Sequence, residues 1–254
     1  EGVVLDFSRH NKRIIDFDRE KQTVRVGAGV VLDDLNSFLK PFNLTFGPDV
    51  ATSSRATIGG MIANNSSGAR AAYYGTTADH VTELEVVMAD GRILKTGLAH
   101  ETLRAQRELF ESMAMLNAIS IGESYPDGLL KRWPGYALDR IARDPGNPIQ
   151  VLAGSEGTLA AIVSAEIKVV PLPEEVGLAL MFFDSVQDAM MAAMELESLR
   201  PVAVEHIDRI LLDQTRGRRE FKVVRDMLEL DAQPCEAILA AEFYHNVGES
   251  LDAL

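Results

Sequence analysis

The first forty residues show two patterns of apolar and polar positions, one typical of strands and one typical of a helix. Strand-like runs lie at residues 2–6, 14–16 and 23–27. In residues 32–39, the apolar side chains recur on one side of a helix. The opening of the chain is therefore predicted to combine three strands with one short helix.

A hairpin and a longer helix are predicted next. Residues 84–88 and 92–96 flank Asp90-Gly91, the dipeptide typical of a two-residue hairpin turn. Residues 100–121 have helical spacing, and a loop is expected at residues 133–136.

Two closely spaced prolines divide the pattern into two parts. Before them, residues 150–152 and 161–170 are predicted to be strands joined by a glycine-containing turn. Pro171-Leu172-Pro173 ends the second strand. We therefore predict a first domain at residues 1–172 and a second at residues 173–254.

The second part has the pattern of a β-α-β unit followed by a third strand. Strands are predicted at residues 176–183, 202–206 and 237–244, with an amphipathic helix at 185–199 and a further helical segment at 207–216. Such a unit is half of a split β-α-β, or ferredoxin-like, sandwich. The predicted fold class is α+β.

Composition and charge narrow the possible functions. The chain has 254 residues, of which 46% are hydrophobic, and a formal net charge of −13. This charge disfavours nucleic acid or an anionic membrane surface as a partner. No apolar stretch is long enough to span a bilayer, so a cytoplasmic location is expected. The single cysteine, Cys235, leaves no cysteine cluster for a metal or iron–sulfur site in these residues.

A glycine-rich loop at residues 47–75 is the clearest functional feature. It contains five glycines and many small polar residues, so its backbone can approach a ligand closely. Thr57 is placed to cap a short helix whose first turn contains Gly59 and Gly60, and a helix N-terminus attracts anions such as a diphosphate. The alternative is that the two glycines serve only to pack the helix under a neighbouring strand.

A second glycine pair, in Gly27-Ala28-Gly29, lies between a predicted strand and a predicted helix. The third glycine of a dinucleotide-binding fingerprint would fall at Leu32, so a plain strand-to-helix turn is favoured.

The glycine-rich loop and several later motifs together resemble the FAD-linked oxidase family, whose members have a vanillyl-alcohol-oxidase or PCMH-type FAD-binding domain. The residues that carry the resemblance are Gly47-Pro48-Asp49, residues 55–68, residues 74–81, Ala89-Asp90-Gly91, residues 135–139, residues 154–159 and residues 204–208. The likeness covers nearly the whole chain. It implies a partial PCMH-type FAD-binding domain followed by a partial ferredoxin-like cap domain.

The resemblance also implies which residues contact FAD. Those that match positions lining the dinucleotide are Pro48, Asp49, Ser53, Thr57, Gly59, Gly60, Asn64, Ser67, Gly68 and Gly75. Gly157 and Ile162 match a later segment whose backbone touches the cofactor. No catalytic acid or base is assigned.

The expected activity is the oxidation of a small 2-hydroxy acid, such as D-lactate or glycolate, by hydride transfer to the flavin. The match is closest to the branch of D-lactate dehydrogenases, the glycolate oxidase flavin subunit and iron–sulfur-fused oxidoreductases. Met61 and residues 64–68 are most similar to the iron–sulfur-fused members. The resemblance therefore implies that electrons pass to an iron–sulfur domain or partner subunit.

The family's other phosphate-binding loop would precede Val3, and the cap would continue past Leu254, so an internal fragment is expected. In the alternative to a flavoenzyme, the fragment by itself is a folded scaffold that holds no flavin and has no catalytic activity.

The histidines are predicted to be structural. His80 follows the glycine-rich loop, and a hydrogen-bonding role is favoured over a position near the flavin. His206 and His245 have no second ligand at metal-binding spacing, so no metal site is predicted.

Overall fold

The computed structural model describes residues 3–96, 108, 112, 115–125, 135–144 and 147–245. The chain divides into two compact units, Glu1–Leu172 (unit 1) and Pro173–Leu254 (unit 2). Both mix helices and strands, which confirms the α+β class.

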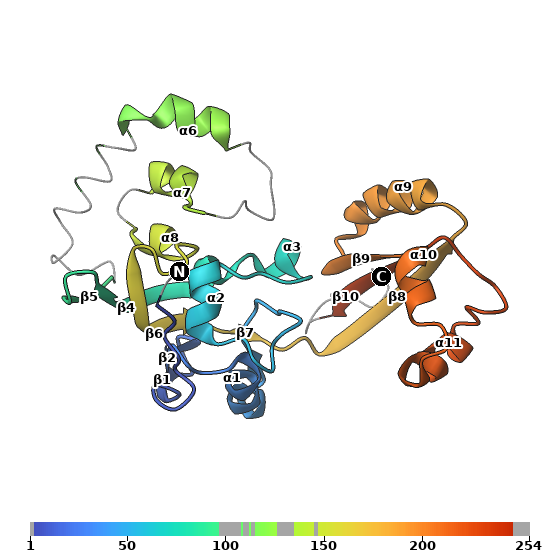
Figure 1. Cartoon of the computed structure of the whole chain (residues 1–254), viewed down its shortest axis with the longest axis horizontal. Helices are drawn as coiled ribbons and strands as arrows, with labels where there is room; N and C mark the ends of the chain where they lie inside the picture. The colour runs from blue at the N-terminus through green and yellow to red at the C-terminus, as the bar shows by residue number, and fades with distance from the viewer. Residues whose placement is uncertain are drawn as a thin grey trace. The chain divides into compact units, whose positions relative to one another are not determined.

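Unit 1 is built on a five-stranded antiparallel sheet (Figure 1). Its strands, in spatial order, are β1 (Ile14–Asp18), β2 (Thr23–Gly27), β6 (Ala160–Lys168), β4 (Val81–Met88) and β5 (Ile93–Lys95). The central strand β6 comes from the end of the unit and lies between β2 and β4, which come earlier in the chain. The sheet is therefore complete only when segments far apart in the sequence have come together.

Two helices pack on one face of this sheet, α1 (Leu32–Leu39) and α2 (Ile58–Asn64). Their buried leucines and isoleucines share one core with the strand residues Val24, Leu84 and Ile167. The opposite face carries a polar cluster, in which Arg25 pairs with Glu83 and Glu166 across three strands.

Short elements complete unit 1. They are η1 (Lys40–Phe42), β3 (Leu44–Thr45), α3 (Ala71–Tyr74), α4 (Thr77–His80), α6 (Ala118–Ser124), α7 (Leu138–Arg143), α8 (Ile149–Leu152) and β7 (Val170–Pro171). β3 and β7 form a two-stranded antiparallel ladder. Most of the predicted helix at 100–121, and residues 133–134 of the predicted loop, lie outside the described residues.

Two strand predictions in unit 1 are wrong. Residues 3–6 are not a strand, and Val3 and Val4 are 89% and 90% exposed. An apolar run needs a neighbouring strand to bond its backbone, and no strand pairs with this run in the described part of the chain. Residues 150–152 belong to helix α8, because a three-residue apolar run fits either structure.

The hairpin of β4 and β5 is confirmed, but its turn has three residues. Met88 N–H donates to Arg92 O and Gly91 N–H donates to Met88 O, each at 2.9 Å. Gly91 has φ +83°, in the left-handed region that such a turn requires.

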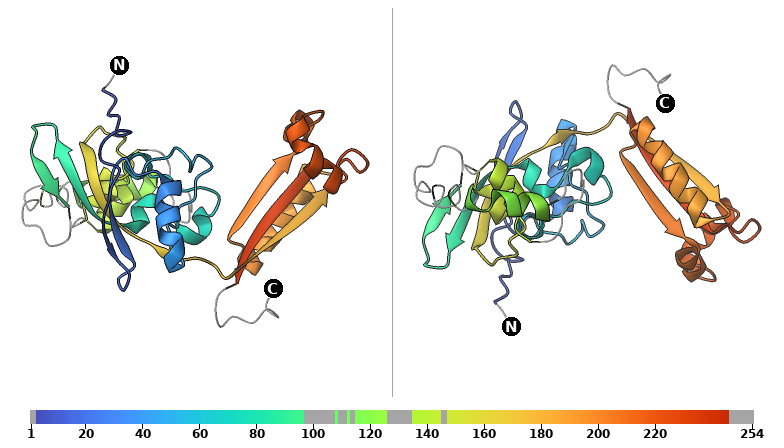
Figure 2. Two further views of the ribbon diagram at one scale, coloured as in Figure 1. Left: turned by 90° about the horizontal axis from the view of Figure 1, so that it is seen from below. Right: turned by 90° about the horizontal axis from the view of Figure 1, so that it is seen from above.

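Unit 2 contains a three-stranded sheet with helix α9 (Val186–Leu196) on one face (Figure 2). The strand order is β8 (Glu175–Phe183), β10 (Ala237–His245) and β9 (Ala203–Asp208), and β10 is antiparallel to both neighbours. A strand inserted between two parallel strands is the split β-α-β arrangement, as predicted.

Helix α9 buries alanines and exposes methionines. Ala189 is fully buried, and Ala192 and Ala193 pack beside it. Met191 and Met194 are 51% and 77% exposed. The helix ends in a 3₁₀ turn, η3 (Glu197–Leu199).

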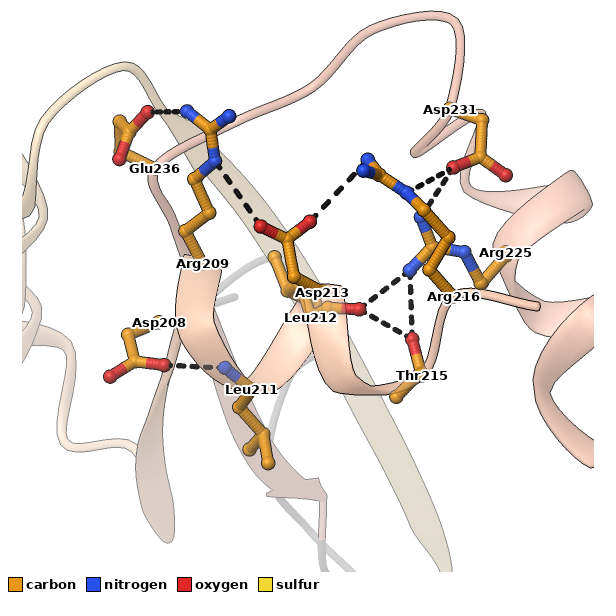
Figure 3. Close-up of polar contacts among 10 residues, drawn as sticks. All are labelled: Asp208, Arg209, Leu211, Leu212, Asp213, Thr215, Arg216, Arg225, Asp231 and Glu236. Carbon is orange, nitrogen blue, oxygen red and sulfur yellow. Dashed lines mark hydrogen bonds and ion pairs between the residues drawn. The ribbon is translucent and has the colours of Figure 1, made fainter. Parts of the chain in front are cut away.

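The other face of this sheet is partly covered by Leu212 of α10 (Arg209–Gln214) and by Leu228 and Leu230. The 3₁₀ turn η4 (Arg219–Phe221) and helix α11 (Lys222–Met227) lie between them in the chain. A row of alternating charges runs along α10 and the loops beside it, from Glu236 through Arg209, Asp213 and Arg216 to Asp231 (Figure 3). The buried side chain of Arg225 closes the row. It donates to Asp231, and its Nη1 lies 2.7 Å from both the Leu212 carbonyl and Thr215 Oγ1.

Candidate functional site

Helix α2 lies within the glycine-rich loop and begins after Thr57. Thr57 Oγ1 accepts a hydrogen bond from Gly60 N–H at 3.2 Å, which confirms the predicted cap. Gly59 N–H donates to Ala28 O at 2.9 Å, and Ile58 N–H is also bonded within the chain. The N–H groups of Ile58, Gly59 and Gly60 are therefore all bonded within the chain, and the first turn offers no open donor for the anion that the sequence pattern predicts.

The two glycines of this turn have different surroundings. A Cβ on Gly59 would lie 2.5 Å from Cβ of Ala28, so Gly59 lets α2 pack on the turn after β2. A Cβ on Gly60 would meet only Thr57 Oγ1, at 3.1 Å, and Gly60 is exposed. Packing accounts for Gly59, whereas Gly60 is exposed and lets a ligand approach the backbone closely, although its N–H is already bonded to Thr57 Oγ1.

Gly27 and Gly29 belong to the strand-to-helix turn between β2 and α1, as favoured above. A Cβ on Gly27 would lie 2.4 Å from Asn11 O, and one on Gly29 would lie 2.7 Å from Cβ of Phe7. These glycines therefore allow the turn to pack against residues 7–11.

The start of the glycine-rich loop meets its later part at Asp49 and Gly68. These residues form a parallel β-bridge, and Arg70 pairs with the Asp49 carboxylate. Pro48, the residue before Asp49, is buried, whereas Asp49 is exposed. The structure thus brings two groups of predicted site residues together.

Hydrogen bonds also join the residues that follow α2 to the first residues of α4. Thr77 donates to the Ser66 carbonyl through its N–H at 2.8 Å and through Oγ1 at 2.6 Å. Ala78 N–H donates to Asn65 Oδ1 at 2.9 Å. Residues 67–76 therefore form a loop whose two ends are held together by these hydrogen bonds.

Asp79 caps the short helix α4 at this base. Its carboxylate accepts from the Thr76 N–H at 2.7 Å and from Thr76 Oγ1 at 2.9 Å, and it pairs with Arg140. Burial alone would raise the pKa of Asp79, but hydrogen bonds from Arg140 and Thr76 outweigh it. The pKa therefore lies below its ordinary value.

His80 is a buried structural residue, as predicted. Its Nε2 lies 2.8 Å from the Tyr74 carbonyl oxygen, and its ring packs edge-on against Phe46. A Cβ on Gly47 would lie 2.8 Å from His80 Cε1, so this glycine leaves room for the ring.

The turn after α8 docks on the C-terminal end of α2. Gly154 N–H donates to Ile62 O and Glu156 N–H donates to Ala63 O, each at 2.9 Å. Gly157 follows in this turn with φ +76°, is exposed, and has no atom within 4 Å of where its Cβ would lie. Its backbone is therefore accessible beside α2.

Ile162 lies in β6, and its side chain belongs to the core. The register of β6 with β2 begins at Ser164, whereas its register with β4 already includes Ala160. In the described part of the chain, no strand therefore pairs with the first residues of β6 on the side away from β4.

The predicted site residues differ in accessibility. Those that are exposed are Asp49, Gly60, Asn64 and Gly157. Those that are half-buried are Ser53, Thr57, Gly68 and Gly75, and those that are buried are Pro48, Gly59, Ser67 and Ile162. The exposed and half-buried residues can contact a ligand. The four buried residues support the backbone of the site from the interior.

Sequence reasoning did not single out Arg70 or Arg140, because their partners lie 21 and 61 positions away. A local signal did exist for Asp79, since Thr76 and Asp79 have the spacing of a capping box.

Among the described residues, no group of three or more His, Cys, Asp and Glu could hold a metal ion. No described helix is long and apolar enough to cross a membrane.

Comparison with known proteins relates this chain to flavoproteins. A family model described as an FAD binding domain matches residues 1–97. The chain is 36% identical over 229 residues to a D-2-hydroxyglutarate dehydrogenase of Pseudomonas putida. The match covers 84% of this chain and 22% of that enzyme.

Two further relatives are each 30% identical over 210 residues. They are a D-lactate dehydrogenase of Archaeoglobus fulgidus and the glycolate oxidase subunit GlcD of Bacillus subtilis. Each match covers 82% of this chain, and it covers 38% of the former protein and 36% of the latter. The chain thus spans well under half the length of these relatives.

Among solved structures, alkyldihydroxyacetonephosphate synthase matches with a TM-score of 0.64. The sequences are 18% identical, and the match covers 94% of this chain and 38% of that one. At this identity, the likeness establishes a shared fold.

Proposed function

Because the chain belongs to the FAD-linked oxidase family, we propose that it forms part of the FAD site of an enzyme that oxidises a small 2-hydroxy acid. Unit 1 would be the FAD-binding domain and unit 2 the beginning of the cap over the flavin. The substrate class is supported by the relatives' names, since hydroxyglutarate, lactate and glycolate are all 2-hydroxy acids. D-Lactate and glycolate remain our candidates, with D-2-hydroxyglutarate beside them.

The observation that supports FAD most is the accessible backbone around α2. Gly60 and Gly157 are exposed glycines, and Asp49 and Asn64 are exposed polar residues of the same loop as Gly60. An elongated polar ligand fits such a surface better than a compact anion, since the first N–H groups of α2 are already bonded. FAD, when bound, would supply the flavin that accepts the hydride.

The roles of the chain's residues are binding and positioning. Asp49, Ser53, Asn64 and Thr57 would offer hydrogen bonds to the cofactor, and the glycines would let the backbone approach it. The buried residues would support this surface from the interior; they are Pro48, Gly59, Ser67 and Ile162. We assign no catalytic base to the described residues.

We further propose an iron–sulfur domain or subunit as the electron acceptor. This rests on the resemblance of Met61 and residues 64–68 to the iron–sulfur-fused branch. Absorbance spectroscopy of the longer protein as purified, with and without dithionite, tests it. Absence of an iron–sulfur band both from that protein and from any subunit that copurifies with it would refute this part.

FAD binding is tested by thermal unfolding of the chain at increasing FAD concentration. A ligand at a hundred times its dissociation constant stabilises by about 2.7 kcal/mol, so a concentration-dependent rise in melting temperature is expected. No rise would favour the alternative, a scaffold without flavin.

A pair of isosteric variants shows where FAD binds. Asn64→Asp places a negative charge beside the proposed site and should weaken binding of the diphosphate. Gln187→Glu makes the same change on an exposed position of α9 and should not. Equal weakening by both variants would contradict the proposed location.

A further inference from the structure

Asp79 joins the end of the glycine-rich loop to a helix 61 positions further along the chain. One carboxylate oxygen accepts from Thr76 N–H and Oγ1, and the other pairs with Arg140 on α7. Both side chains are partly buried, at 36% and 21% exposure. Partial burial makes the charged contact stronger and more directional than one at an open surface.

Arg140 extends this connection to a third segment. Its Nη1 also donates to Gln150 Oε1 on α8 at 2.8 Å. The turn that follows α8 is the one that docks Gly154 on Ile62 of α2. Arg140 therefore connects the loop to α8, the helix that precedes the turn containing Gly157.

The geometry of Gly75 depends on the same carboxylate. Gly75 has φ +77°, and a Cβ there would lie 2.6 Å from Asp79 Oδ2. The carboxylate thus occupies the space that the glycine leaves. The turn at Gly75 and the position of Asp79 therefore support each other.

We infer that Asp79 and Arg140 are a positioning pair that holds residues 66–78 in the shape that receives FAD. This inference rests on the proposed function. Neither residue needs to touch the cofactor. The pair acts through Thr76 and Gly75. Its loss would leave residues 66–78 less firmly held in place, while the core of unit 1 would keep all of its side chains.

Three variants and a control test this inference. Asp79→Asn and Arg140→Gln remove the charge on either side, while Arg140→Lys keeps it. The control is Asp90→Asn, because Asp90 also accepts a backbone N–H, at 3.0 Å, and pairs with an arginine, but lies in the β4–β5 turn. Hydrogen exchange of residues 65–80 measures the order of the loop, and FAD titration measures affinity.

We expect Asp79→Asn and Arg140→Gln to speed exchange in residues 65–80 and to weaken FAD binding about tenfold. Arg140→Lys should recover part of both, and Asp90→Asn should change neither. Wild-type exchange in residues 65–80 in both charge-removing variants would overturn the inference. So would faster exchange spread evenly over unit 1, which would indicate a merely structural role. If the wild-type chain binds no FAD, the proposed function fails for this chain, and the exchange data still decide whether the pair orders the loop.

Discussion

Gly68 lies so close to Asp49 that a methyl group on Gly68 would sit 1.6 Å from the Asp49 carbonyl oxygen. The two residues form a β-bridge between the start of the glycine-rich loop and the segment that follows α2. Gly68 also has φ +100°, which side chains rarely tolerate. This contact brings together predicted cofactor residues from before and after α2.

Replacing Gly68 by Ala should therefore destabilise unit 1 strongly. We expect a loss of about 3 kcal/mol, from steric overlap added to backbone strain. Gly91→Ala is the matched control, since Gly91 has φ +83° but no atom within 4 Å of its Cβ position. It should lose only about 1 kcal/mol. Urea unfolding of both variants measures the difference, and equal losses would contradict the packing argument.

Gly59 and Gly60 should respond differently to substitution by alanine. Gly59→Ala forces a contact with Ala28 and should cost about 2 kcal/mol or more. Gly60→Ala should change stability by less than about 1 kcal/mol, because alanine favours the helix and the site is exposed. Gly60→Ala should nevertheless weaken FAD binding. Urea unfolding and FAD titration separate the effects, and unchanged affinity would remove Gly60 from the site.

Acid should remove the contribution of Asp79 to stability. Because its folded pKa is lowered, the charged form stabilises the fold at a pH above the ordinary value of about 3.9. This contribution is lost as the pH falls through the folded pKa. The gap in melting temperature between wild type and Asp79→Asn should therefore narrow from about pH 6 towards pH 3. A gap that stays constant over this range would be inconsistent with the lowered pKa.

In unit 2, Arg225 should be far less replaceable than Arg216. Arg225 is 5% exposed and donates to Leu212 O, Thr215 Oγ1 and Asp231. Lysine cannot reproduce this fork, so Arg225→Lys should cost about 2 kcal/mol. Arg216 has a side chain that is 56% exposed, and Arg216→Lys should stay within about 0.5 kcal/mol. Similar losses in urea unfolding would argue against a special role for the buried fork.

Much of the fold could be predicted because its signals are local. The strand at Thr23–Gly27, the helix at Leu32–Leu39 and the cap at Thr57 follow from residues that are neighbours in sequence. The split β-α-β unit was predicted from the order of its strand and helix patterns along the chain. A prediction was wrong where a short apolar run fits a strand and a helix equally well, as at Ile149–Leu152.

The candidate site was less predictable, because its order depends on distant partners. The family resemblance named Gly59 and Gly60 alike, but only packing against Ala28 separates them. Asp79 had a capping-box signal, yet its arginine lies 61 positions away.

The sequence by itself determined the α+β class, the two-part organisation of the pattern and the family, because periodicity and motif order are properties of neighbouring residues. Only the tertiary structure decided which donors of the glycine-rich loop are already bonded and which glycines are open. It also decided that Asp79 meets Arg140. These outcomes depend on burial and on contacts between residues far apart in the chain, and local pattern carries no information about either.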